Sequence, residues 1–434
     1  MESLRAFFRL DFFRNFMKLF SSSVLAQGLS LVLAPLLSRL YTPEDFGLVA
    51  LYLGILSILS VISTAKYEQA IMLPKKEGDA VNIIWLVLVI TLSVALITAL
   101  ITVFLNRPIA NLSGNPDIGP WLYFLPLSIL FHGVFQSATF YANRTKRFGT
   151  IAQSTIVQYT FLNGARVLAG WVRTAFNGLV AGQLVAQFVS ALFIVKKTLV
   201  PIRAKQSEVS WSAIKAQASL YRGYPKYNMM LNLTNNLSGS LPIFMFTWGF
   251  SAEVAGFYAF GYTFVFRPLS LFSLSALQVL SQKIIENFHR GKEIYPGLKK
   301  LVSRFFILGI IPFLVIAIWA PSIFSFIFSD VYAPAGRYLQ ILCPWLFMVF
   351  LTAPLSFLPE LFFRQKKAMV IDIIYLVLRF FALAAGIWQN DAILAMALFS
   401  GVSTLVVGYN LFWYLQLARR HQKTLISKTN ENEK

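Results

Sequence analysis

The corner that decides the fold reads Tyr41-Thr42-Pro43-Glu44-Asp45-Phe46-Gly47-Leu48-Val49-Ala50, and it joins two long apolar stretches. A second corner, Phe250-Ser251-Ala252-Glu253-Val254-Ala255-Gly256-Phe257-Tyr258-Ala259, follows the same pattern. When the two corners are aligned without gaps, at one constant offset, Gly256 falls at the position of Gly47. The repeated corner is the first sign of two halves that share one plan.

The apolar stretches that precede the two corners are related by the same offset. It places Asn232 on Ser23 and Asn236 on Gln27, so polar residues recur at matching positions. Repeats of this kind are common in proteins that carry solutes across membranes. The sequence therefore predicts two pseudo-symmetric halves.

The composition is that of a membrane protein. Of the 434 residues, 57% are hydrophobic and 13% are charged, and the mean hydropathy is +0.65. Soluble domains carry about 25% charged residues, so this chain needs lipid around it. The single cysteine, Cys343, excludes an internal disulfide and is predicted to serve packing.

Apolar stretches of about 20 residues are long enough to span a bilayer as helices. The chain contains twelve of them, joined by short turns, which predicts an all-α integral membrane fold of two six-helix bundles. The twelve predicted spans are 16–38, 46–68, 81–105, 119–142, 148–170, 174–195, 224–248, 253–280, 301–320, 337–360, 369–388 and 391–416. The predicted parts are an N-terminal half 1–195, a basic linker 196–223, a C-terminal half 224–416 and a basic tail 417–434.

The charge of +20 sits in the turns between spans and not on a soluble domain, which argues against nucleic-acid binding. Most of the 38 Lys and Arg residues fall on alternate turns, on one predicted side of the membrane. The positive-inside rule then predicts that both termini and the linker are cytoplasmic. These basic turns also favour anionic lipid headgroups, although setting the topology is sufficient to explain them.

The seventh predicted span carries the most polar face. Asn228, Asn232, Asn235 and Asn236 follow a helical spacing and share one stripe. Such a stripe faces either a neighbouring helix or a wet cavity, and its length favours the cavity. The first span repeats the pattern with Ser23 and Gln27, so both spans are predicted to line one cavity.

Two arginines lie inside predicted spans. An arginine at a helix centre costs roughly 2.5–3.5 kcal/mol on an insertion scale. Arg379 has Asp372 two turns earlier on its face, so either a structural ion pair or a ligand site explains it. Arg267 has no acid nearby in the sequence, which favours an anionic ligand gripped by its guanidinium.

Other charged residues lie at span ends or inside spans. Lys66 and Glu68 close the second span and are either solvated anchors or parts of a gate. Glu68, Glu360 and Asp372 are the acids that could carry a coupling cation, a proton or sodium. No phosphate-binding GxxxxGK[ST] loop or GxSxG elbow is present, and the three histidines are too far apart to suggest a metal site. The pattern predicts a transporter without a cofactor and not an enzyme.

At this point the chain resembles the polysaccharide-unit flippases, the Wzx type, of the superfamily that also holds multidrug extruders (MATE) and the lipid II flippase. The resemblance covers the whole chain. It rests on residues 41–47, on Lys66-Tyr67-Glu68-Gln69-Ala70, on Asn143-Arg144-Thr145-Lys146-Arg147-Phe148, on Tyr224-Pro225, and on Glu253, Gly256 and Tyr258 with Arg267-Pro268.

This resemblance implies a substrate, an undecaprenyl-pyrophosphate-linked oligosaccharide, moved to the outer leaflet of a bacterial inner membrane. Arg267 and Arg379 would hold the pyrophosphate, the asparagine stripe would face the sugars, and the halves would rock between two access states. The polymerase and chain-length proteins of an O-antigen, capsule or exopolysaccharide pathway would be partners. The alternatives are a multidrug/cation antiporter, a membrane-embedded polymerase or sugar transferase, and a scaffold for other glycan enzymes.

Overall fold

The computed structural model describes residues 2–172, 177–291 and 293–432, with side chains omitted at 2–20, 272, 274–283, 289 and 423–432. Nearly all of these residues are helical, and none of them is in a strand. The elements are α1 (Glu2–Leu40), α2 (Pro43–Thr64), η1 (Tyr67–Met72), α3 (Glu77–Leu112), η2 (Pro116–Ile118), α4 (Gly119–Leu122), α5 (Leu125–Arg144), α6 (Phe148–Trp171), α7 (Gly178–Arg203), η3 (Gln206–Glu208), α8 (Trp211–Leu220), η4 (Tyr224–Asn228), α9 (Met229–Gly249), α10 (Ala252–His289), α11 (Tyr295–Phe328), η5 (Asp330–Tyr332), α12 (Ala333–Thr352), η6 (Ala353–Leu355), α13 (Leu358–Leu361), α14 (Gln365–Trp388) and α15 (Ala392–Asn432).

The predicted helical membrane fold is confirmed. Each predicted span coincides with a long helix, and within the described residues eight helices are long and apolar enough to cross a membrane. A ninth crossing is the pair Pro116–Leu122 and Leu125–Arg144, bent by 53°. The long helices α6, α9 and α10 carry more polar residues, including the asparagine stripe on α9. The chain is a multi-pass membrane protein.

The chain forms two compact units that divide after Gly256, within α10. The predicted linker 196–223 is mostly helical, because α7 runs on to Arg203 and is followed by η3 and α8. In the first unit α8 packs against α3, so this segment is part of the folded body. The start of the predicted sixth span, 174–176, lies outside the described residues.

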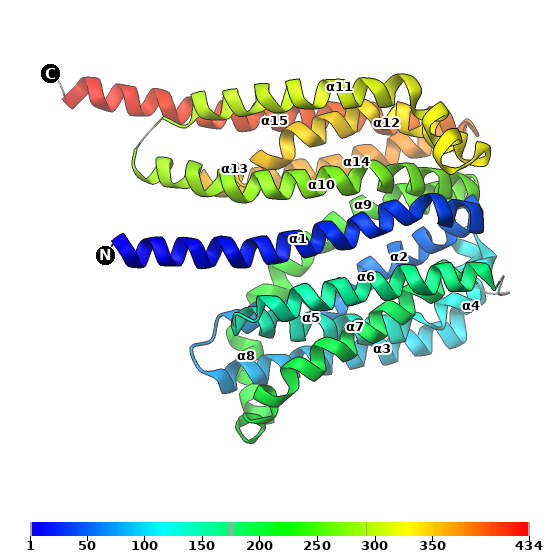
Figure 1. The fold of residues 1–434 in the computed structure, drawn as a ribbon, viewed down its shortest axis with the longest axis horizontal. Coiled ribbons are helices and arrows are strands. Elements are labelled where there is room, and N and C mark those ends of the chain that lie inside the picture. The colour runs from blue at the N-terminus through cyan, green and yellow to red at the C-terminus, as the bar shows by residue number, and fades with distance from the viewer. Residues whose placement is uncertain (1, 173–176, 292, 433–434) are drawn as a thin grey trace. The chain divides into compact units, whose positions relative to one another are not determined.

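The first unit is built from helices that pack in a continuous series. The helix α1 runs alongside α6, and α6 runs alongside α7 (Figure 1). A buried hydrogen bond joins the first two, since the Asn163 amide donates to Ser30 Oγ at 2.9 Å. On another side α2 packs against α9, where Ser57 and Ser240 hydroxyls lie 3.2 Å apart.

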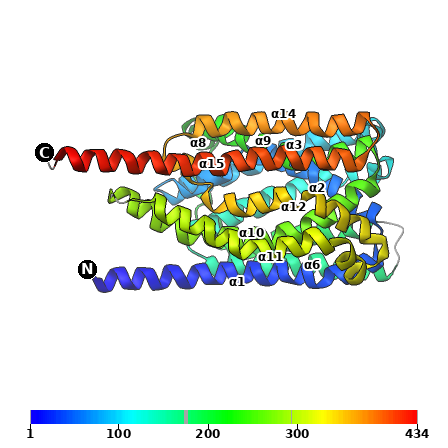
Figure 2. The same ribbon diagram turned by 90° about the horizontal axis from the view of Figure 1, so that it is seen from above.

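The second unit packs α12 against α11 and α15, with α14 beside α15 (Figure 2). Its apolar core is rich in aromatic rings: Phe260 meets Phe328 edge-on, with ring centroids 4.8 Å apart. Cys343 is buried and donates to the Phe313 carbonyl, consistent with the packing role predicted for it.

The first corner is held by hydrogen bonds at both of its ends. Thr42 and Asp45 form a capping box at the start of α2, which satisfies backbone donors that a helix end leaves open. Asp45 Oδ1 also accepts from Asn177, the residue that caps α7. The Tyr41 hydroxyl donates to the Arg166 carbonyl at 2.6 Å, and burial raises the pKa of Tyr41 to about 12.

The two corner glycines place the first turns of α2 and α10 in backbone contact. A Cβ on Gly47 would overlap the carbonyl of Ala252, and a Cβ on Gly256 would overlap the carbonyl of Pro43. The offset between the two corners places Ala252 on Pro43. The contact is therefore reciprocal, as in an isologous interface related by a two-fold axis. The two copies of the repeated corner therefore contact each other at equivalent positions.

Candidate functional site

The polar site of the first unit starts at an unusual turn after α2. Ala65 (φ 47°) and Lys66 (φ 61°) are consecutive left-handed residues, and neither is glycine. Each such residue costs about 1–2 kcal/mol relative to a right-handed one. The turn ends α2 and leads at once into the short helix η1. The surrounding contacts must hold this strained turn in place, as is common at functional sites.

Those contacts tie η1 to α8 and to α5, and α5 in turn to α3. The Tyr67 hydroxyl donates to the Ala218 carbonyl of α8 at 3.0 Å, and burial raises the pKa of Tyr67. Arg144 of α5 donates to the Ile71 carbonyl at 3.2 Å and lies 3.5 Å from Glu77 of α3. These hydrogen bonds anchor η1, the helix that directly follows the turn.

Lys66 and Glu68 form a largely buried ion pair. Lys66 Nζ lies 3.6 Å from Glu68 Oε1, and their side chains are 17% and 4% exposed. The second oxygen, Oε2, is buried without a hydrogen-bond partner among the described residues. His132 of α5 lies close to Lys66. This burial contradicts the interpretation of Lys66 and Glu68 as solvated anchors.

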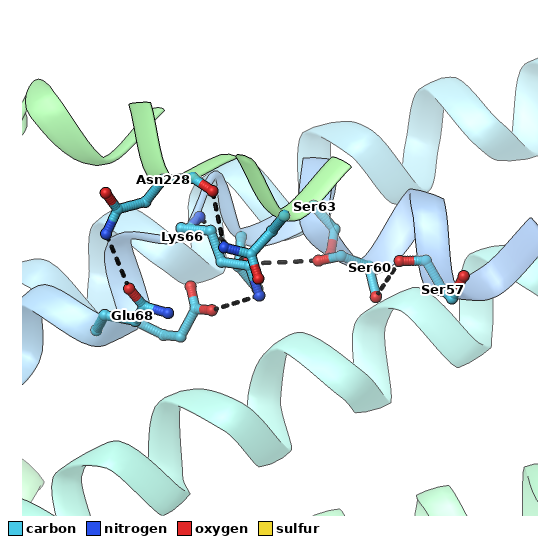
Figure 3. A network of polar contacts seen from close by, with 9 residues as sticks. Ser57, Ser60, Ser63, Lys66, Glu68 and Asn228 are labelled. Carbon is cyan, nitrogen blue, oxygen red and sulfur yellow. Dashed lines mark hydrogen bonds and ion pairs between the residues drawn. The ribbon is translucent and has the colours of Figure 1, made fainter. Parts of the chain in front are cut away.

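Gln69, the residue after Glu68, links this pair to the asparagine stripe, and Figure 3 shows Lys66 and Glu68 beside Asn228. Asn228 Nδ2 donates to Gln69 Oε1 at 3.1 Å, and Asn232 donates to the Asn228 carbonyl at 2.8 Å. On the other side of Lys66, the hydroxyls of Ser57, Ser60 and Ser63 run along one face of α2 (Figure 3). Polar side chains therefore occur in all three elements, from α9 through η1 to the second half of α2.

The asparagine stripe is not sealed inside the packing of the first unit. Asn235 is exposed, while Asn228, Asn232 and Asn236 are half-buried. Asn228 makes the interhelical bond that one interpretation predicted, but the others keep accessible surface. Gln27 and Ser23 of α1 are also half-buried. A cavity lined by both spans stays a prediction.

In the second unit, Arg379 lies in an aromatic cage. Its guanidinium carbon lies 4.1 Å from the Tyr375 ring centroid, 4.7 Å from that of Phe399 and 5.0 Å from that of Trp345. The side chain is buried, and Nε donates to Ser403 Oγ at 3.2 Å. The ring faces supply the negative electrostatic potential that stabilises a buried cation.

The alternative in which Asp372 pairs with Arg379 is contradicted. Among the ion pairs of the described residues, none joins Asp372 to Arg379. The guanidinium points to rings contributed by α12, α14 and α15 instead. Asp372 is half-buried, and Glu360 is exposed on α13. Arg267 is half-buried on α10, directly after Phe266, which stacks on Tyr262.

Sequence reasoning missed several members of these sites. Gln69 stands next to Glu68 in the motif that marked the resemblance, so its position was the available signal. His132 lies close to Lys66 but stands on another helix, α5, far from it in the sequence. The cage residues Trp345 and Phe399 are ordinary aromatic residues in a chain with 15% aromatic content, so nothing singled them out.

The fold is that of the transporters of the MOP superfamily. The lipid II flippase MurJ, in an inward closed conformation, matches with a TM-score of 0.73 at 12% identity, over 93% of this chain and 91% of that chain. An inward-facing multidrug resistance MATE family transporter matches with a TM-score of 0.67 at 12% identity, over 93% and 96%. A MOP superfamily transporter from Pyrococcus furiosus matches with a TM-score of 0.56 at 11% identity, over 94% and 96%.

Sequence similarity identifies the family of the chain among the proteins that share this fold. The profile of the family described as "Polysaccharide biosynthesis protein" matches residues 36–284, more than half of the chain, and the chain belongs to this family. Over 104 residues it is 32% identical to the succinoglycan biosynthesis transport protein ExoT of Rhizobium meliloti (strain 1021). That match covers 24% of this chain and 20% of the relative, so it spans about a fifth of the relative's length. The resemblance to the polysaccharide branch of the superfamily is confirmed.

Proposed function

We propose that the protein is a flippase for lipid-linked oligosaccharide units used in surface polysaccharide biosynthesis. The family and the fold support membrane transport in such a pathway. The observation that carries the proposal is the accessible asparagine stripe on α9, which comprises Asn228, Asn232, Asn235 and Asn236. Carboxamides both donate and accept hydrogen bonds, which suits the hydroxyl groups of a sugar.

The lipid carrier in this proposal is undecaprenyl pyrophosphate. Arg267 is half-buried and carries a fixed positive charge that can bind two phosphate oxygens side by side. Arg379 is buried among three rings, so we assign it to shaping the aromatic cage. We assign the phosphates to Arg267 because its side chain keeps accessible surface. The polyprenyl tail would stay in the bilayer while the headgroup crosses.

Transport in this proposal proceeds by alternating access. An inside-negative potential favours outward movement of an anion by about 2.3 kcal/mol per charge per 100 mV. That gain disappears if arginines move with the pyrophosphate, so a coupling cation would supply the driving force. Glu68, buried beside Lys66 with one free oxygen, is the acid whose surroundings best suit a proton or sodium ion.

The sidedness of the lipid-linked glycan in cells tests this function. Spheroplasts that lack the protein would be probed from outside with a sugar-specific lectin, with and without the gene restored. We expect lipid-linked units to accumulate inside and to reach the outer leaflet only after restoration. Intact units on the outside without the protein, in a strain with no second flippase, would overturn the proposal. Drug hypersensitivity of the same strain would favour the multidrug alternative.

A further inference from the structure

A basic cavity lies in the second unit, where α14 begins beside α15. Its volume is about 310 Å³, and its lining includes Arg364, Lys367, Arg420 and His421 with Trp413. Among the residues that the structure describes, no acidic one lines it. It shares no residue with the Arg379 cage or with the stripe on α9, so the function proposed above leaves it unused.

Side chains from α14 and α15 line the cavity. Trp413, Arg420 and His421 stand at positions i, i+7 and i+8 of α15, on one helical face. Lys367 comes from the first turn of α14, and its Nζ lies 4.7 Å from the Trp413 ring centroid. The ammonium group also lies 5.5 Å from the Tyr409 ring centroid, so two aromatic rings of α15 hold this positive charge at the cavity.

His421 adds an unsatisfied polar atom to this lining. Its ring packs against Phe288 and Phe362, with centroids 4.6 and 5.8 Å away. Its Nε2 atom is buried without a hydrogen-bond partner among the described residues. Buried polar atoms normally have a partner, so an unpartnered one calls for an explanation. A ligand oxygen in the cavity would provide that partner.

The start of α14 strengthens the positive potential. Its N-cap residue, Arg364, makes no side-chain capping bond, and no acidic residue occupies the first turn. The open N–H groups and the helix dipole of this 24-residue helix therefore add to the charges of Lys367 and Arg420. Glu293 lines a different cavity and accepts a hydrogen bond from Gln422 at 2.6 Å.

We propose that this cavity binds the phosphate group of a lipid at the membrane surface. The cationic side chains, the open helix end and the unpartnered imidazole nitrogen match phosphate oxygens. The positive-inside pattern puts the cavity on the predicted cytoplasmic side. Two lipids carry this chemistry there, a resident anionic phospholipid and the polyprenyl pyrophosphate of the cargo, of which the second rests on the proposed function.

The test is lipid binding to the purified full chain. Nanodiscs of phosphatidylcholine with a minor fraction of phosphatidylglycerol form one arm, and the same discs with undecaprenyl pyrophosphate form the other. Lipid retained by the protein is counted by native mass spectrometry. Lys367→Gln with Arg420→Gln removes two lining charges, and we expect affinity to fall about 30-fold.

The matched control is Lys366→Gln with Arg419→Gln. These residues are exposed neighbours in the same two helix turns, they do not line the cavity, and the charge change is identical. The control should bind as the unchanged protein does. Equal loss in both double variants, or equal retention of phosphatidylcholine alone, would overturn the proposal. Because the readout is binding, a protein that binds phosphatidylglycerol but flips nothing would sink the flippase function and leave this site standing.

Discussion

Gly47 and Gly256 lie against each other's helix, each at a point where a Cβ would overlap a carbonyl of the opposite backbone. Gly47 meets Ala252, and Gly256 meets Pro43. Ala252 and Pro43 occupy equivalent positions in the two corners, so the two contacts are equivalent as well. Such close approach needs glycine because any side chain would push the helices apart. The repeat seen in the sequence is thus expressed as a contact that only glycine permits.

Gly256→Ala is expected to destabilise the protein by about 1–3 kcal/mol, since the added methyl group meets the Pro43 carbonyl. The unfolding temperature of the purified protein in detergent measures this. Gly164→Ala is the control, because a Cβ there has open space. Alanine is also favoured over glycine within a helix by about 0.5–1 kcal/mol. Equal behaviour of the two variants would contradict the close crossing.

Removing Lys66 alone is expected to be costly because it leaves the Glu68 carboxylate buried without its cation. Lys66→Met should lower the unfolding free energy on the order of 3 kcal/mol. Adding Glu68→Gln should restore part of that loss, giving a coupling energy of about 0.5–3 kcal/mol in a double-mutant cycle. Strictly additive effects would show that the two side chains do not interact.

The asparagine stripe is expected to matter for transport more than for folding. Asn232→Leu with Asn236→Leu removes two carboxamides with accessible surface, and a loss of two hydrogen bonds predicts roughly tenfold slower export. Surface glycan in a complemented deletion strain is the readout. Thr234→Val on the same helix is the control, because its hydroxyl is already bonded to the Met230 carbonyl. Normal export in the double variant would argue against sugar contacts at this face.

The two intramembrane arginines are expected to respond differently. Arg267→Ala should abolish export while the protein folds normally, since the residue is half-buried and assigned to the phosphates. Arg379→Lys should lower stability by about 1–3 kcal/mol, because an ammonium cannot lie flat among three rings and donate to Ser403. Expression, unfolding temperature and export together separate the two effects. Full complementation by the Arg267 variant would remove its assigned role.

The positions of the membrane helices could be predicted from the sequence because length and apolar composition are properties of single segments. The ends of the helices could not be predicted, since α3 with 36 residues and α11 with 34 residues are longer than a bilayer requires. The predicted linker contained a helix, α8, because Ser210 caps it and α3 holds it.

The sites were only partly predictable, because their geometry depends on contacts between distant segments. Ala65 and Lys66 adopt the left-handed backbone conformation, which residues other than glycine and asparagine rarely adopt. The residue types at this turn therefore gave no local signal of its conformation. Asp372 shares a helix face with Arg379, yet the cation is satisfied by aromatic rings from three helices. Periodicity identifies a face but does not show what packs against it.

The most direct test of the central claim is lipid flipping by the purified protein. Proteoliposomes would carry an undecaprenyl-pyrophosphate-linked oligosaccharide in both leaflets, and a membrane-impermeant glycosidase added outside would report the accessible fraction. We predict that the inner pool becomes accessible with the unchanged protein and stays protected with Arg267→Ala. An inner pool that stays protected with the unchanged protein, both with and without a proton or sodium gradient, would contradict the flippase function.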